Sequence, residues 1–271
     1  MEKILYVSDL DGTLLNERQE MTSFTKNVIN RLVKQGMLFS YATARSFITA
    51  EKVAGSLIAD VPAIVYNGTF IIDRKTGMRM VSNIFSTQQI QQIKGVLNAY
   101  NISPIVYSLQ GKEKFSFFKK RINSQMQLFL NSRKGDVREN PLTDEQRLYE
   151  GRVFYLTCID EEEKLYSAWQ QLKDEYNCIY DKDIYSGRQW LEILPHSASK
   201  ANAVCQLKQI LGCDRVISFG DAINDCTMFQ ISNECYAVSN ADKRLKKEAT
   251  GVIAGNNEDA VARWLMENRK I

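Results

Sequence analysis

The sequence begins with a stretch that decides the fold, Ile4-Leu5-Tyr6-Val7-Ser8-Asp9-Leu10-Asp11-Gly12-Thr13. Its apolar part predicts a buried strand, because it is short and lies too near the terminus to be a good helix. The strand would carry the carboxylates of Asp9 and Asp11 to its end, on the same side if the extended conformation continues. Two acids held together repel each other unless a cation or a proton lies between them. The stretch therefore predicts a metal site where open α/β sheets bind their ligands.

Strands and helices alternate along the rest of the chain, except in its middle. A helix is expected over 22–36 and a second strand over 37–42, and Asn67-Gly68 suits a tight hairpin turn after a third strand. The same alternation returns with a helix over 199–211 and a strand over 215–219. Because strand, helix and strand in succession form a crossover with parallel strands, the sequence predicts an α/β fold with a doubly wound, mostly parallel sheet.

The middle of the chain is richer in charged residues, and its helical patterns alternate with short strands. We expect an inserted α+β domain over residues 82–189, between two parts of the core at 1–81 and 190–271. Within the insertion, residues 133–147 are expected to form a polar loop or a poorly packed connector, and Ser186-Gly187-Arg188 is expected to form a turn.

Composition argues against several classes of protein. The net charge of +3 over 271 residues is too small to indicate a nucleic-acid or membrane partner. No apolar stretch is long enough to span a bilayer, and Asp9 interrupts the only run that could belong to a signal peptide. The six cysteines form no C-x-x-C pair and indicate reduced thiols. We therefore expect a cytoplasmic protein, monomeric or weakly self-associating, that binds neither nucleic acid nor membrane.

Polar side chains follow three of the expected strands: Asp9 and Asp11, Thr43, and Asp221 with Asp225. The carboxyl ends of parallel strands share one edge of a sheet, so these groups can converge there with Lys200. Carboxylates and water suit octahedral Mg²⁺.

Other catalytic arrangements do not fit this sequence. With a single histidine, a Ser/His/Asp triad is not expected, and a Cys-x5-Arg loop and the glycine-rich nucleotide loops are missing from the sequence. Carboxylate nucleophile chemistry assisted by a metal is what remains.

Taken together, these motifs resemble those of the haloacid dehalogenase superfamily of phosphohydrolases. Asp9 to Thr13 matches the first motif, Thr43 the second, Lys200 the third and Gly220-Asp221 through Asn224-Asp225 the fourth. The long insertion between the second and third motifs is similar to the larger α/β cap of the Cof-type group, subclass IIB. Ala201 and Ala44 stand where many relatives have glycine. These two departures concern the exact positioning of the site residues and the role of Arg45.

The resemblance implies a role for each acid. Asp9 would attack phosphorus and form an aspartyl-phosphate, and Asp11 would protonate the leaving group and then activate water. Mg²⁺ would be held by Asp9, the Asp11 carbonyl and Asp221, and Asp225 would orient these ligands.

The remaining roles concern the phosphoryl group and the substrate. Lys200 would offset the negative charge, and Thr43 would hydrogen-bond a phosphoryl oxygen. The resemblance also implies substrate contacts from five residues: Leu10 and Ala44 through backbone N–H groups, and the side chains of Arg45, Asn67 and Asn224. For Asn67, a purely structural role in the turn is an equal alternative.

The expected function is a Mg²⁺-dependent phosphatase that acts on a small phosphorylated metabolite, with sugar phosphates favoured by the resemblance. Phosphorylated cofactor precursors and nucleotides are alternative substrates. A phosphomutase that passes the phosphoryl group to a sugar hydroxyl is a second hypothesis. A third is a binding protein without activity, which the intact set of reacting groups argues against.

Overall fold

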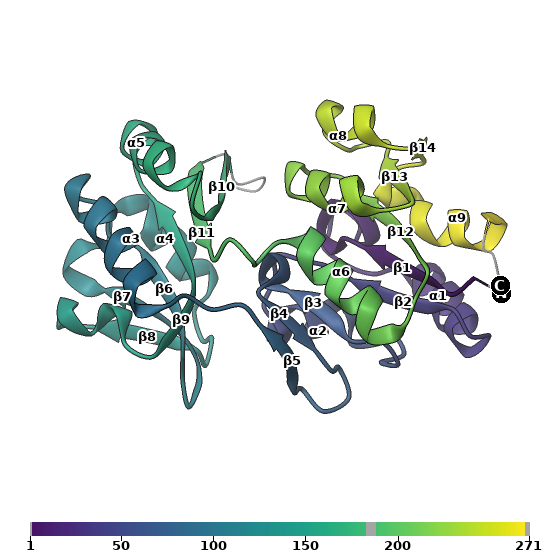
Figure 1. Cartoon of the computed structure of the whole chain (residues 1–271), viewed down its shortest axis with the longest axis horizontal. Helices are drawn as coiled ribbons and strands as arrows, with labels where there is room; N and C mark the ends of the chain where they lie inside the picture. The colour runs from purple at the N-terminus through teal and green to yellow at the C-terminus, as the bar shows by residue number, and fades with distance from the viewer. Residues whose placement is uncertain (1, 183–187, 269–271) are drawn as a thin grey trace. The chain divides into compact units, whose positions relative to one another are not determined.

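The computed structural model of the protein describes residues 2–182 and 188–268. Contacts divide the chain into two compact units, Met1–Ser82 with Ala198–Ile271, called here the first unit, and Asn83–Ser197, the second unit (Figure 1). No helix in the described part of the chain has both the length and the apolar character that a membrane span requires.

The first unit is built on a sheet of five parallel strands in the order β14-β13-β12-β1-β2. The strands are β1 (Ile4–Ser8), β2 (Leu38–Tyr41), β12 (Arg215–Gly220), β13 (Glu234–Val238) and β14 (Gly251–Ile253). The parallel sheet confirms the predicted α/β fold. Because β1 lies between β12 and β2, its carboxyl end adjoins the ends of both neighbours.

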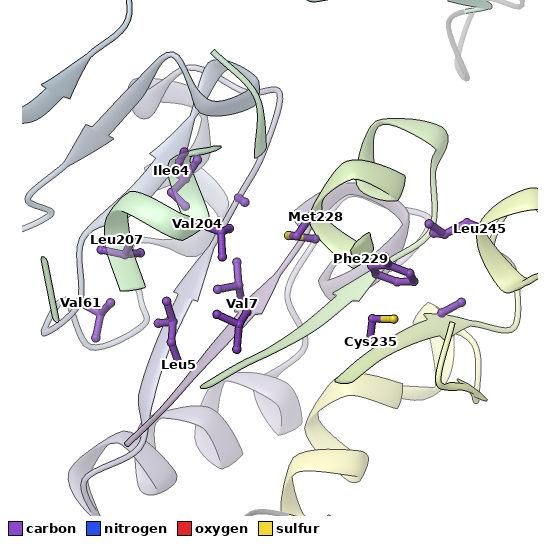
Figure 2. Packing of buried hydrophobic residues seen from close by; sticks show 14 of the residues in the cluster. Leu5, Val7, Val61, Ile64, Val204, Leu207, Met228, Phe229, Cys235 and Leu245 are labelled. Carbon is purple, nitrogen blue, oxygen red and sulfur yellow. The ribbon is translucent and has the colours of Figure 1, made fainter. Parts of the chain in front are cut away.

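Helices cover both faces of this sheet (Figure 1). They are α1 (Ser23–Lys34), α2 (Phe47–Ala54), α6 (Lys200–Leu211), α7 (Cys226–Ile231), α8 (Lys243–Glu248) and α9 (Ala260–Asn268). On one face, Leu5 and Val7 of β1 belong to the same buried cluster as Val204 and Leu207 of α6 (Figure 2). On the other face, Trp264 of α9 packs against aromatic rings of β12 and β13. Burying apolar side chains on both faces is the main stabilising contribution to such a layered fold.

A small antiparallel sheet extends the first unit beyond β2. It consists of β3 (Ala63–Val65), β4 (Phe70–Ile72) and β5 (Arg79–Ser82). A bridge between Ala42 and Ile64 links it to the end of β2. The pairing of β3 with β4 around Asn67-Gly68 confirms the predicted hairpin.

The second unit contains a sheet of six strands in the order β10-β11-β9-β6-β7-β8, antiparallel except for the pair β7 and β8. Its elements are α3 (Thr87–Ala99), β6 (Ile105–Gln110), β7 (Lys112–Phe118), α4 (Ser124–Ser132), β8 (Glu139–Leu142), β9 (Arg152–Ile159), α5 (Glu162–Leu172), β10 (Asn177–Lys182) and β11 (Gln189–Leu194).

Two expectations for this region need correction. Residues 190–194 were assigned to the core, but as part of β11 they pair with β9 and β10, and Leu191 and Ile193 are buried within the second unit. A short apolar run has the same sequence pattern in either sheet, so the sequence could not show which of the two sheets contains it. Residues 133–147 are not simply a loop, since they contain β8 and the start of a short helical turn, Glu145–Tyr149. The turn expected at Ser186-Gly187 lies outside the described residues.

Candidate active site

The carboxyl ends of β1, β12 and β2 meet at one edge of the parallel sheet. Asp9, the residue after β1, donates its backbone N–H to the Phe219 carbonyl of β12 at 2.9 Å. Ala42, at the end of β2, donates to the Ser8 carbonyl at 3.0 Å. Residues that follow these three strands are therefore held close to one another by the backbone of the sheet.

A buried lysine lies between two acids at this edge. Lys200 Nζ is 2.6 Å from Asp9 Oδ1 and 2.7 Å from Asp225 Oδ1. The lysine is the first residue of α6, which is capped by the side chain of Ser199. Its side chain is only 1% exposed, and that of Asp225 is 0% exposed. Because a lone buried charge is costly, this ammonium group depends on its two carboxylate partners.

Asp9, Asp221 and Asp225 form what we call the acidic cluster, in which one oxygen of each lies within 4.8 Å of the others. Burial, and then the neighbouring carboxylates, raise the pKa of Asp9 well above its usual value, although Lys200 opposes the shift. Burial and Asp225 raise the pKa of Asp221 to about 7. Three carboxylates against one ammonium leave two negative charges uncompensated, so the cluster favours a proton or a further cation.

Lys200 carries its charge in spite of burial. Burial opposes the charged form, but the carboxylates of Asp225 and Asp9 outweigh this effect and raise the pKa of the lysine. A permanent positive charge beside Asp9 lowers the repulsion that any anion would meet there.

The oxygens of Asp225 are used within the protein. Oδ1 contacts Lys200, while Oδ2 accepts hydrogen bonds from the backbone N–H groups of Asp221 and Ala222 at 3.0 and 3.1 Å. Glycine is required at position 220, since a Cβ atom there would lie 2.6 Å from Asp225 Oδ2. Asp225 therefore fixes the loop that carries Asp221, and Asp9 and Asp221 are the members of the cluster best placed to bind a cation directly.

Thr13 contacts the acidic cluster, although the sequence did not single it out. Its hydroxyl donates to Asp221 Oδ1 at 2.9 Å. The threonine approaches because Gly12 has a φ of +74°, and a Cβ atom at Gly12 would lie 2.2 Å from Asp221 Oδ2. Its place as the last residue of the Asp9–Thr13 motif was the available signal, although nothing in the spacing identified Asp221 as its partner.

Asp11 points to a different partner from Asp9. Leu10–Leu14 forms a turn that is closed by a bond from the Leu15 N–H to the Leu10 carbonyl at 2.8 Å, with non-helical backbone angles at Asp11 and Gly12. The strand therefore does not continue through Asp11, so the condition under which both acids would share one side is not met. The buried side chain of Leu10 and the left-handed Gly12 stabilise the turn instead.

Arg45 is the partner of Asp11. Its Nε and Nη2 atoms lie 2.7 and 2.5 Å from the two oxygens of the Asp11 carboxylate, a bidentate arrangement. Nη2 also donates to Gln19 Oε1 at 2.9 Å. The pair keeps the Asp11 side chain outside the acidic cluster.

The segment after β2 contains three of the expected residues. Thr43 is buried, and its hydroxyl accepts the Arg45 N–H at 3.1 Å. Ala44 lies exposed in the bend between them. The Thr43 carbonyl accepts the N–H of Asn67 at 2.9 Å, and Asn67 Oδ1 accepts Asn224 Nδ2 at 3.2 Å. The two asparagines expected to touch substrate thus contact each other.

The turn that carries Asn67 is strained. Tyr66, Asn67 and Gly68 have φ values of +49°, +50° and +97° in succession. Left-handed conformations cost a non-glycine residue roughly 1–2 kcal/mol. A Cβ atom at Gly68 would lie 2.1 Å from the Ser199 carbonyl, so the turn abuts the residue before Lys200.

The doubly wound sheet with polar groups at its carboxyl edge is typical of α/β enzymes. The family model for haloacid dehalogenase-like hydrolases matches residues 6–265, so the chain belongs to this family. The match confirms the resemblance drawn from the motifs.

Individual relatives agree with this assignment. The chain is 26% identical over 278 residues to the 5-amino-6-(5-phospho-D-ribitylamino)uracil phosphatase YwtE of Bacillus subtilis (strain 168), with 95% of each chain covered. It is 24% identical over 275 residues to YitU of the same organism, which has the same activity in its name, with 97% of this chain and 96% of YitU covered. The enzyme is accordingly a phosphatase, a phosphoric monoester hydrolase.

Solved structures share the fold. A haloacid dehalogenase-like hydrolase from Bacteroides thetaiotaomicron superimposes with a TM-score of 0.79 at 23% identity, covering 98% of this chain and 99% of the other. A protein from Thermotoga maritima gives a TM-score of 0.80 at 20% identity, covering 100% and 99%.

Proposed function

We propose that this phosphatase hydrolyses small phosphomonoesters with the help of Mg²⁺, by way of a phosphoryl group transferred to Asp9. The observation that carries the proposal is the acidic cluster around Lys200, with two negative charges uncompensated. A divalent cation would balance them, and an all-oxygen donor set suits Mg²⁺.

The residues at the site fit this ion. Asp9 and Asp221 would hold Mg²⁺ with the Asp11 carbonyl, while Asp225 would keep Asp221 in place through the backbone N–H groups that it accepts. When bound, the metal would neutralise charge on the phosphoryl oxygens.

Asp9 is the proposed nucleophile. Lys200 contacts its Oδ1, so attack on phosphorus would use Oδ2. As the bond from Oδ2 to phosphorus forms, the ester P–O bond breaks, and Asp11 in its protonated form would give its proton to the departing oxygen. Water would then attack the same phosphorus and pass a proton to Asp11 while the bond from phosphorus to Asp9 Oδ2 breaks. Phosphate would leave, and the Asp9 carboxylate would be restored. The pair between Asp11 and Arg45 would have to open for these transfers.

Other groups would hold the substrate. Thr43 and the backbone N–H groups of Leu10 and Ala44 are proposed to bind phosphoryl oxygens, with Arg45 freed from Asp11 as a further donor. Asn224 Oδ1 is buried and has no hydrogen-bond partner among the described residues, so it could accept a hydrogen bond from a substrate hydroxyl. Its neighbour Asn67 would fix the amide in place.

The proposed substrates are phosphate esters of sugars or of related polyols. Family likeness favours sugar phosphates, and the names of YwtE and YitU describe a phosphoribityl compound as the substrate of those enzymes. By the same likeness, we propose that the first unit is the catalytic core and that the second unit is a cap domain that selects the leaving group.

A panel assay tests this proposal. Phosphate release would be measured with sugar phosphates, phosphorylated ribityl compounds and nucleotides, in the presence of Mg²⁺. We expect Asp9→Asn to abolish turnover and Asp60→Asn, which alters an exposed pair with Lys75, to leave it unchanged. Substantial activity in Asp9→Asn would reject the covalent step, and formation of an isomeric sugar phosphate without free phosphate would reveal a mutase.

A further inference from the structure

The loop between β13 and α8 makes an unexpected contact with the first motif. Asn240 Nδ2 donates to the Gly12 carbonyl at 2.8 Å, and Asn240 Oδ1 accepts the backbone N–H of Asn256 at 3.0 Å. One amide thus joins the turn that carries Asp11 to two segments more than 200 residues further along the chain.

The same loop reaches Asp221 from the other direction. The backbone N–H of Asp242 donates to the Asp221 carbonyl at 2.8 Å. Asn240 binds the peptide group that joins Gly12 to Thr13, and the Thr13 hydroxyl donates to Asp221 Oδ1. Asp221 therefore accepts a bond from Asp242 at its backbone and one from Thr13 at its carboxylate, and the peptide before Thr13 accepts a bond from Asn240.

The loop itself is well anchored. Ser239 donates its N–H to the Ala254 carbonyl at 3.2 Å, and its own carbonyl accepts Lys246 Nζ at 2.5 Å. Asn256, which donates to Asn240, also donates its side chain to the Leu15 carbonyl at 2.9 Å. Hydrogen bonds on both sides of Asn240 therefore hold its loop in place, which a positioning residue requires.

We propose that Asn240 is a positioning residue for the cation site: it holds the Gly12–Thr13 peptide so that Thr13 orients the Asp221 carboxylate, and it thereby sets the affinity for Mg²⁺. The inference rests on the proposed function. An amide is suited to this place because it donates to one carbonyl and accepts from an N–H group, whereas a carboxylate can only accept.

Mg²⁺ binding, measured by calorimetry on the full chain without substrate, tests the inference. Asn240→Ala removes both bonds, and Asn240→Asp keeps the acceptor for Asn256 but places a carboxylate oxygen against the Gly12 carbonyl. We expect each change to weaken Mg²⁺ binding about five- to tenfold, the size of one net hydrogen bond. For Asn240→Asp the loss would occur although the added negative charge alone would attract a cation.

Asn257→Asp is the matched control. Asn257 is a neighbouring exposed residue whose side chain accepts the Glu17 N–H and does not reach Gly12. The Asn257→Asp variant gains the same negative charge as Asn240→Asp, and the Mg²⁺ affinity of this control should stay within about twofold of the parent value.

Activity gives a second readout. At low Mg²⁺ the Asn240 variants should show a reduced kcat with an unchanged KM for substrate, and excess Mg²⁺ should restore kcat. An affinity equal to that of the parent in Asn240→Ala would overturn the inference while leaving the proposed function intact. A parent protein that does not bind Mg²⁺ would overturn both.

Discussion

At the scale of single residues, the site depends on how Lys200 is paired. The lysine and its partners Asp9 and Asp225 are almost completely buried, so removing the ammonium group leaves two acids without their counter-charge. Breaking a buried ion pair in this way typically destabilises a protein by about 3–5 kcal/mol.

We therefore expect Lys200→Met to lower the free energy of unfolding by about 3 kcal/mol or more and to abolish turnover. Urea denaturation without Mg²⁺ measures the first effect. Lys75→Met is the control, because Lys75 pairs with Asp60 on the surface, and it should cost less than about 1 kcal/mol. Equal losses in the two variants would contradict the central role of the buried ammonium group.

Asp221 gives a prediction about pH. Burial and Asp225 raise its pKa from the usual 3.8 to about 7, so between these values the folded protein binds a proton that the unfolded chain has released. The free energy of unfolding contributed by this group therefore falls as pH rises from about 4 to about 7. Deprotonation also prepares the carboxylate to bind a cation, so Mg²⁺ affinity should rise over the same range.

The measurement compares the parent with Asp221→Asn by urea denaturation in EDTA at pH 5 and pH 8. Asparagine cannot titrate, so the free energy of unfolding should fall less, or rise more, between pH 5 and pH 8 in the variant than in the parent. An identical pH dependence in both proteins would show that Asp221 has an ordinary pKa.

At the scale of elements, the turn Tyr66–Gly68 and the start of α6 fit tightly together. A Cβ atom at Gly68 would lie 2.1 Å from the Ser199 carbonyl, which is backbone and cannot move aside without shifting α6. Gly36 has the same φ of +97° but no neighbour within 4 Å of its added Cβ atom. Comparing substitutions at these two glycines therefore separates the effect of steric contact on stability from the effect of backbone strain.

We expect Gly68→Ala to destabilise the protein by about 3 kcal/mol or more, since strain and a backbone clash act together. Gly36→Ala should cost only about 1 kcal/mol, the left-handed penalty alone. Thermal unfolding of both variants checks this, and a similar loss in the two would mean that the contact with Ser199 is easily relieved.

The elements also show how far the sequence could lead. The strands around Asp9 and Asp221 were predictable because short apolar runs end in polar motifs, and the parallel order brings such ends together. The contacts of Thr13, Gln19 and Asn240 were not, because each joins loops that have no periodicity and lie far apart in the chain. The turn at Leu10–Leu14 was missed for a related reason: its geometry depends on Gly12 fitting against Asp221, which local propensity does not reveal.

At the scale of the whole molecule, the proposed cation would link activity to stability. The folded protein gathers Asp9, Asp221 and Asp225, which an unfolded chain keeps apart, so an ion bound there stabilises the folded state by mass action.

We expect EDTA to abolish phosphate release and added Mg²⁺ to restore it, with a rise in Tm that grows with Mg²⁺ concentration. The control is Asp221→Asn, in which the rise in Tm should be much smaller. Full activity after exhaustive chelation would reject the role of the metal in turnover.

The burial of Lys200 has one more consequence. Dissolved salt weakens the attraction between exposed charges such as Lys75 and Asp60, because counter-ions gather around them. Counter-ions cannot approach an ammonium group whose side chain is 1% exposed. The electrostatic field at Asp9 should therefore persist in concentrated salt, and changes in ionic strength should act on the arrival of a charged substrate rather than on the reacting groups themselves.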